Sequence, residues 1–185
     1  MELRARRFVV AGTGVPPRAA AVYYRALADV TGGTIVALPF GGLGPVGESA
    51  RRVAEIVLAD GGPVELVGHS QGGLVAAMLA ARHEDVRRVV TLGAPLAGTA
   101  WCRIPSPVPA LHDMAEGHAI CPGDRLVTIV GSHDAVIVPW TSGLVPGAAQ
   151  HVIPAGHLAL PNHPDVLAIV ADWAHARSGA VAAWS

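Results

Sequence analysis

The chain has 185 residues, of which 15% are charged and 51% hydrophobic, and its formal net charge is −1. This length fits a single domain over residues 1–185 that buries roughly 70% of its unfolded surface, and this composition argues against intrinsic disorder. Basic residues cluster only at Arg4, Arg6 and Arg7, which gives no electrostatic footprint for nucleic acid or an anionic membrane. Apolar runs such as 74–81 are too short to span a membrane, so we expect a soluble globular protein.

No apolar signal segment precedes the first strand-like run. We therefore expect a cytoplasmic protein, or a secreted one if a leader has been removed. Cys102 and Cys121 could pair across a loop, yet two cysteines also occur as free thiols in cytosolic chains, and we favour free thiols. The oligomeric state stays open.

Apolar, β-branched runs alternate with helical patterns along the chain. The predicted strands are 7–11, 34–38, 64–67, 86–92, 126–130 and 151–153. The predicted helices are 17–29, 46–59, 71–81 and 164–177, with a short one near 111–116 inside a Pro/Gly-rich stretch, 93–123. This alternation predicts an α/β fold with a mostly parallel sheet of about six strands and helices on both faces.

The strongest motif is GHSQGG at residues 68–73, which contains G-x-S-x-G between a predicted strand and a predicted helix. A sharp turn there lifts the hydroxyl of Ser70 clear of the sheet, and small neighbours avoid clashes. A glycine-rich turn with a capping serine is the alternative. The strand before it, the helix after it and the double glycine favour a nucleophile.

A serine hydroxyl is a weak nucleophile until a base takes its proton, and a carboxylate must orient that base. In G-x-S-x-G hydrolases the acid and then the histidine follow the serine along the chain. Asp134 follows the predicted strand 126–130, and His157 follows the strand 151–153. Since ligand groups gather at the carboxyl ends of such strands, we predict a Ser70–Asp134–His157 triad.

Other acids and histidines fit these roles less well. We interpret Asp113 and Asp124 as loop or capping carboxylates, and His69 as a structural residue packed behind the elbow. The remaining candidates flank the required turns or lie on the last helix: His133, His151, His163 and His175.

An oxyanion hole needs two backbone donors. The amide of Gln71, after the nucleophile, is one, and the loop after the first strand should supply the other, for which we choose the amide of Thr13. Gly12 and Gly14 could instead form a dinucleotide-binding loop, but no third glycine follows at the required spacing.

The elbow, the segment TLGAPLAGT at 91–99, and the placement of Asp134 and His157 resemble small bacterial lipases and esterases of the α/β-hydrolase superfamily. The likeness runs through nearly the whole chain in the same order. It implies a minimal α/β-hydrolase fold without antiparallel edge strands, and ester hydrolysis with no cofactor. Ala11 departs from the pattern, since many of these relatives have a histidine there.

The stretch 93–123 follows a strand next to the elbow and should form a cap-like loop bordering the active site. Trp101, Ile104 and Val108 are predicted to contact the acyl chain of a substrate. The alternative, strongest for Leu111 and Met114, is that these side chains cover the end of the sheet as core.

The sequence thus predicts a carboxylic ester hydrolase acting on a small-molecule acyl ester, with no metal ligands at recognisable spacing. An acyl-thioesterase or acyltransferase would use the same residues. A non-catalytic binding protein is a third interpretation, but a binder has no chemical need for all three triad residues.

Overall fold

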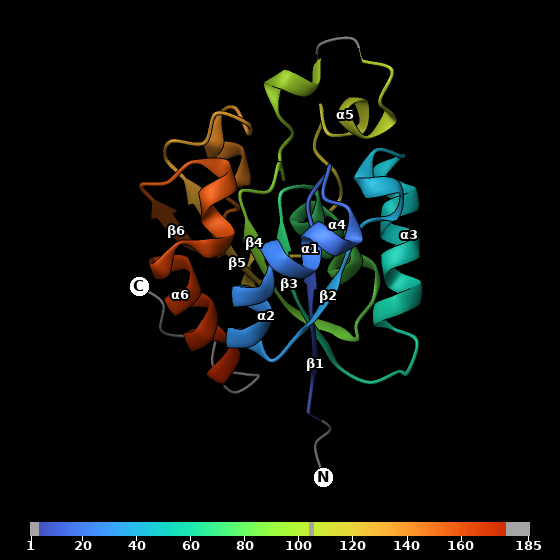
Figure 1. Cartoon of the computed structure of the whole chain (residues 1–185), viewed down its shortest axis with the longest axis vertical. Helices are drawn as coiled ribbons and strands as arrows, with labels where there is room; N and C mark the ends of the chain where they lie inside the picture. The colour runs from blue at the N-terminus through green and yellow to red at the C-terminus, as the bar shows by residue number, and fades with distance from the viewer. Residues whose placement is uncertain (1–3, 104–105, 177–185) are drawn as a thin grey trace.

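The computed structural model describes residues 4–103 and 106–176, except the side chains of Trp101 and Arg103. Strands and helices alternate through these residues, as predicted (Figure 1). The strands are β1 (Arg6–Val10), β2 (Thr34–Val36), β3 (Val64–His69), β4 (Val86–Leu92), β5 (Leu126–Gly131) and β6 (Ala149–Ile153). The α-helices are α1 (Pro17–Tyr23), α2 (Arg25–Thr31), α3 (Val46–Val57), α4 (Gln71–Arg82), α5 (Pro109–Asp113) and α6 (Pro164–His175).

The strands form one sheet in the order β2-β1-β3-β4-β5-β6, and all five neighbouring pairs are parallel. The prediction of about six mostly parallel strands is confirmed. From β1 the chain moves to β2 on one side and then returns to β3 on the other side. The loops after β1 and β3 therefore leave in opposite directions, and in open α/β sheets ligands bind at the carboxyl ends of the strands at such a point.

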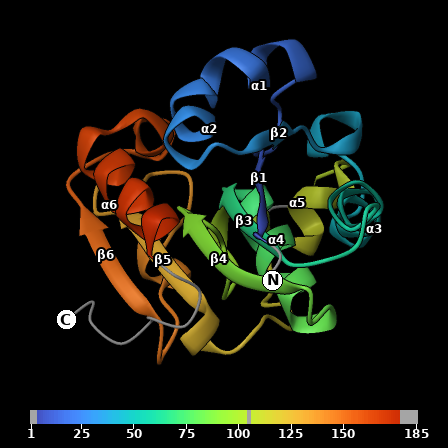
Figure 2. The same cartoon turned by 90° about the horizontal axis from the view of Figure 1, so that it is seen from below.

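Helices cover both faces of the sheet (Figure 2). One core cluster contains Phe8 and Val10 of β1 and packs under α3 and α4, whereas Val9 belongs to a second cluster under α2 and α6. This alternation follows from the two-residue period of a strand. None of the helices within the described ranges is long and apolar enough to cross a membrane.

The predicted helix 17–29 is two helices, and this difference has a physical cause. The pattern favours one helix, but the chain turns at Tyr24, whose φ and ψ are −98° and 11°. The side chain of Tyr24 is fully buried, and its hydroxyl bonds to two groups near the elbow. Tertiary contacts thus override local helix propensity.

The segment 93–123 packs onto the α4 side of the sheet. It contains the 3-10 helix η2 (Ala100–Arg103) and α5. Cys102 and Cys121 are both buried free thiols in the first core cluster, and the amide of Cys121 donates to the carbonyl of Ala77 on α4. The expectation of free thiols agrees with this structure.

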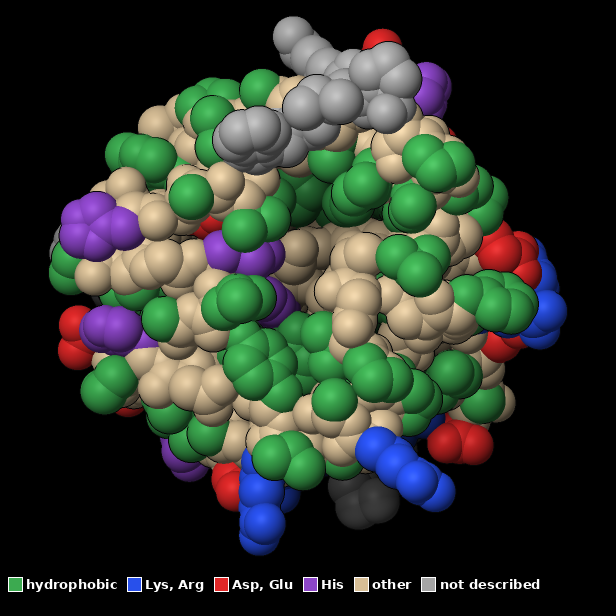
Figure 3. Space-filling model, turned by 45° about the horizontal axis from the view of Figure 1, so that its top comes forward, with side chains coloured by type: hydrophobic (Ala, Val, Ile, Leu, Met, Phe, Trp, Pro, Cys, Tyr) green, Lys and Arg blue, Asp and Glu red, His purple; other side chains and the backbone are tan. Residues whose placement is uncertain are grey.

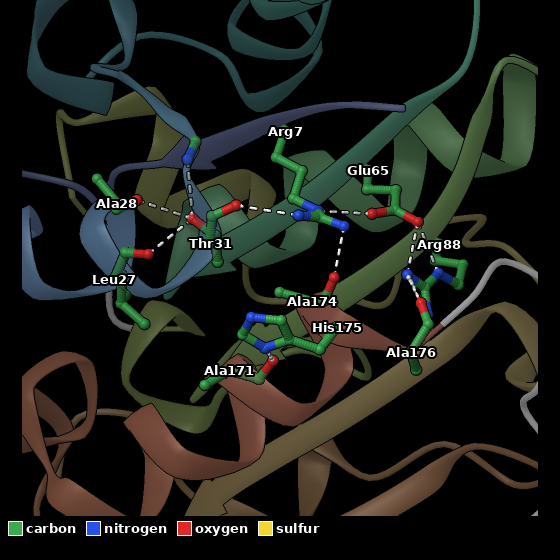
Figure 4. A network of polar contacts seen from close by, with 11 residues as sticks. Arg7, Leu27, Ala28, Thr31, Glu65, Arg88, Ala171, Ala174, His175 and Ala176 are labelled. Carbon is green, nitrogen blue, oxygen red and sulfur yellow. Dashed lines mark hydrogen bonds and ion pairs between the residues drawn. The ribbon is translucent and has the colours of Figure 1, made fainter. Parts of the chain in front are cut away.

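An ion network ties the sheet to two helix ends (Figure 4). Glu65 on β3, 1% exposed, pairs with Arg7 at 2.8 Å and with Arg88 at 2.6 Å. The two guanidinium groups also donate to backbone carbonyls at the carboxyl ends of α2 and α6, namely those of Thr31, Ala174 and Ala176. The network binds helix ends that carry partial negative charge.

Candidate active site

Ser70 occupies the sharp turn between β3 and α4, where its φ and ψ are 55° and −128°. Residues with a side chain rarely adopt this left-handed conformation, which costs about 1–3 kcal/mol. A Cβ on Gly68 would overlap the carbonyl of Gly72, and one on Gly72 would overlap the carbonyl of Ala11 on the neighbouring loop. The turn packs so closely that glycine is required on both sides of the serine.

The structure brings Asp134 and His157 into direct contact. His157 Nδ1 lies 2.7 Å from Asp134 Oδ2, and both residues are 6% exposed. The second carboxylate oxygen, Oδ1, accepts the amides of Val136 and Ile137, each at 2.8 Å. Since an ionised carboxylate only accepts hydrogen bonds, Nδ1 of His157 carries the proton, which leaves Nε2 free to accept one.

These hydrogen bonds keep Asp134 ionised. Burial alone would raise the pKa of its carboxyl, but the bonds from His157 and from the two amides outweigh burial, and the pKa lies below its ordinary value of 3.8. The pair therefore combines a carboxylate with an imidazole whose ring orientation is fixed.

Gly93, at the end of β4, lets this pair approach the elbow. A Cβ at this position would lie 3.1 Å from both Asp134 Oδ2 and His157 Nδ1, and φ is 52°. The preceding residue, Leu92, accepts the amide of Ser70 at 2.9 Å. Ser70 and the Asp134–His157 pair thus flank the same strand end.

Within the part of the chain that the structure describes, Ser70 and His157 are not hydrogen-bonded to each other. Among the bonds of the described residues, none joins the serine Oγ to the imidazole. Such bonds are often long before substrate binds and tighten in the reacting complex. His69, next to Ser70, contacts the backbone of His157, since its Nε2 lies 3.1 Å from the carbonyl oxygen of His157.

The backbone amides of the two predicted oxyanion donors, Thr13 and Gln71, are not used in hydrogen bonds among the described residues. Within the described residues, the amide of Thr13 has no hydrogen-bond partner, and neither has that of Gln71, the first residue of α4. The two side chains are joined, as Thr13 Oγ1 donates to Gln71 Oε1 at 2.6 Å. Other amides of the first loop are used internally and bond to Val36 O, Tyr24 Oη and Gly41 O.

The alternative acids and histidines lie elsewhere. Asp113 accepts the amide of Val46 at 2.9 Å, as a cap of α3, and His163 caps α6. The others are outside the acid–base pair: Asp124, His133 and His175 are exposed, and His151 lies on β6.

The predicted acyl contacts are only partly visible. Ile104 and the side chain of Trp101 lie outside the described part of the chain. Val108 is half-buried and packs on the first core cluster with Leu111, and Met114 belongs to that cluster. For the last two, the alternative of a core role agrees with the structure.

Exposed apolar side chains follow three strand ends, those of β2, β5 and β6. Phe40 is 79% and Leu158 is 70% exposed, and Leu43 and Val136 are each 48% exposed. Figure 3 shows hydrophobic side chains around a hollow at this end of the molecule, with histidine side chains at its edge. A ligand that enters there meets an apolar rim.

Comparisons with known proteins agree with this architecture. A family model described as the alpha/beta hydrolase fold matches residues 54–117, which include the elbow. None of the curated proteins compared with the chain matches its sequence.

Among solved structures, a protein assigned to the alpha/beta hydrolase superfamily from Xanthomonas campestris pv. campestris is 22% identical with a TM-score of 0.63, covering 92% of this chain and 98% of that one. A meta-cleavage product hydrolase from Pseudomonas fluorescens IP01 is 15% identical with a TM-score of 0.66, covering 93% and 91%. A monoacylglycerol lipase from Paleococcus ferrophilus is 15% identical with a TM-score of 0.63, covering 91% and 93%. The chain has the α/β-hydrolase fold, and the predicted resemblance is confirmed at this level.

Proposed function

We propose that this protein is a serine hydrolase that cleaves carboxylic esters with apolar acyl groups. The observation that carries the proposal is the 2.7 Å contact of His157 with Asp134 beside the strained elbow of Ser70. The unpartnered amides of Thr13 and Gln71 support it, because they suit a developing oxyanion.

In this mechanism, Nε2 of His157 takes the proton of Ser70 as Oγ attacks the ester carbonyl. Asp134 stabilises the resulting imidazolium without accepting its proton. The negative oxygen of the tetrahedral intermediate binds the amides of Thr13 and Gln71. Collapse releases the alcohol, which receives the proton from His157, and water then hydrolyses the acyl-enzyme by the same steps.

The apolar rim and the packing of the segment 93–123 indicate the kind of ester. The described part of that segment contributes Ala110, Met114 and Cys121 to the core, which favours a fixed wall over a mobile lid. We therefore expect short to medium acyl chains to be preferred. Each buried methylene contributes about 0.8 kcal/mol, so selectivity among acyl lengths should be modest.

The test combines a fluorophosphonate probe with turnover of p-nitrophenyl esters of two to sixteen carbons. The parent should be labelled and active, and Ser70→Ala should lose both properties. Ser142→Ala is the matched control, because it removes a buried hydroxyl for which the described residues provide no hydrogen-bond partner. A parent that resists the probe would contradict the proposal.

The same preparation separates the related activities. Acyl-thioesters of equal chain length measure the preference for sulfur over oxygen esters. Sharp activation on emulsified substrate, with preference for the longest chains, would contradict the fixed wall and indicate a mobile lid.

A further inference from the structure

A buried chain of hydrogen bonds connects the first loop, the elbow and the loop that carries the base. The amide of Gly12 donates to Tyr24 Oη at 2.9 Å, and Tyr24 Oη lies 2.8 Å from His69 Nδ1. On the other side of the ring, His69 Nε2 lies 3.1 Å from the carbonyl oxygen of His157. Tyr24 is fully buried and His69 is 3% exposed, so water does not compete for these bonds.

The chemistry of the two ends fixes every donor and acceptor in this chain. The carbonyl of His157 can only accept, so His69 must carry its proton on Nε2. Nδ1 of His69 then accepts from the hydroxyl of Tyr24, which in turn accepts the amide of Gly12. This single arrangement of protons satisfies the amide of Gly12, the hydroxyl of Tyr24 and both ring nitrogens of His69. It requires the imidazole of His69 to be neutral.

Burial keeps that imidazole neutral. Burial first, and then the neighbouring His157, lower the pKa of His69 from 6.5 to about 3, although the bond to the His157 carbonyl and the charge of Asp134 oppose the shift. The rings of His69 and His157 are also in contact, with centroids 4.7 Å apart.

The first loop packs directly against the elbow, so these hydrogen bonds also affect the position of the loop relative to Ser70. A Cβ on Gly12 would lie 3.1 Å from the Cβ of Ser70 and 3.2 Å from His69 Nδ1, so this part of the loop rests directly on the elbow. The amide of Gly12 is used in its hydrogen bond to Tyr24 Oη, so the next amide along the loop that is available for a ligand is that of Thr13.

We infer that Tyr24 and His69 are positioning residues, which set the placement of the first loop and of the backbone of His157 relative to Ser70. The inference rests on the proposed function, in which the amide of Thr13 and the ring of His157 serve the reaction. Neither residue touches the substrate. Both act through the groups they hold, so their loss should change turnover more than substrate binding.

Kinetics of paired variants test this role. Tyr24→Phe leaves the amide of Gly12 and Nδ1 of His69 without their shared partner, and we expect kcat to fall about 10- to 100-fold, less than for loss of an oxyanion donor, with KM within about twofold. His69→Leu should behave alike. His69→Gln should keep kcat within about fivefold, because its amide can still donate to the His157 carbonyl and accept from Tyr24.

Val170→Ala controls for stability, because it weakens the same core cluster as Tyr24 without touching the chain of bonds. If Tyr24→Phe and His69→Leu lower the melting temperature like Val170→Ala and leave kcat unchanged, the inference is wrong. Equal losses in His69→Gln and His69→Leu would also overturn it.

Nitrogen-15 spectra of the full chain, with labelled histidine, test the bonds without any need for activity. One imidazole should appear as the neutral Nε2–H tautomer with shifts that stay constant from pH 8 to pH 5. Its signals should vanish in His69→Gln, and the Nδ1 signal should move in Tyr24→Phe. An Nδ1–H tautomer, or titration near pH 6.5, would overturn the inference even if the protein proves to be an esterase.

Discussion

Asp134→Asn offers the sharpest test of the acid–base pair, because the structure dictates how the new side chain must lie. Oδ1 of Asp134 accepts two amides, from Val136 and Ile137, at 2.8 Å each. The asparagine must keep its carbonyl oxygen there, since its NH₂ group would face two donors. Its NH₂ group is therefore directed at Nδ1 of His157.

This arrangement enforces the wrong tautomer of the base. Nδ1 of His157 has to accept from the asparagine, so the ring proton moves to Nε2, where the proton of Ser70 should go. In enzymes with a Ser-His-Asp triad, loss of the correct histidine tautomer lowers kcat about 10⁴-fold. At about 1.36 kcal/mol per tenfold, this equals about 5.5 kcal/mol of transition-state stabilisation.

The assay is p-nitrophenyl butyrate turnover, with melting temperatures measured in parallel. Asp134→Asn should melt near the parent because it keeps both amide bonds, whereas Asp134→Ala loses three hydrogen bonds and about 3 kcal/mol of stability. Asp113→Asn is the control, since among the described residues that carboxylate accepts the amide of Val46 at the start of α3 and lies outside the Asp134–His157 pair. A kcat of Asp134→Asn within tenfold of the parent would refute the reasoning.

Three further predictions concern the surroundings of the site. Gly93→Ala should lower kcat and should also lower the free energy of unfolding by about 1–3 kcal/mol. Gly32 has the same left-handed backbone but no atom within 4 Å of an added Cβ, so Gly32→Ala should lower only the stability measured in thermal melts. Burial lowers the pKa of His69 to about 3, so below about pH 6.5 the unfolded chain binds a proton at this residue that the folded chain does not bind. In chemical denaturation, the free energy of unfolding of the parent should therefore fall from pH 6.5 towards pH 3, and it should fall less in His69→Gln. Glu65→Gln should cost about 3–5 kcal/mol by leaving two arginines without their carboxylate, with kcat of the folded fraction unchanged, whereas Glu48→Gln on the surface should barely move the melting temperature.

The elbow could be predicted from sequence because its causes are local. Gly68 and Gly72 are required by overlaps within the turn and with the adjacent loop, so the spacing of the motif itself carries the geometry. Asp134 and His157 could be predicted as a pair for a different reason. In a parallel sheet the loops after successive strands meet at one edge, and chain order alone then brings the two side chains together.

The chain of bonds through Tyr24 could not be predicted in this way. It joins positions separated by 45 and 88 residues, and each link depends on ring orientations that only the packed structure fixes. The break between α1 and α2 has the same origin. A run of good helix formers predicts one helix, and the buried hydroxyl of Tyr24 decides otherwise.

The strain at Ser70 persists because both flanking elements are held rigidly. β3 is buried along its whole length, and α4 is buried from Gln71 to Ala80 between the sheet, α3 and the segment 93–123. Relaxing the serine to an ordinary φ would have to move one of them, and moving α4 would break packing on two sides. Since the amide of Gln71 belongs to the first turn of α4, the packing that preserves the strain also fixes the amide that we propose as one oxyanion donor. The strain at Ser70 and the fixed amide of Gln71 therefore have a single structural cause: a buried helix that begins directly after the serine.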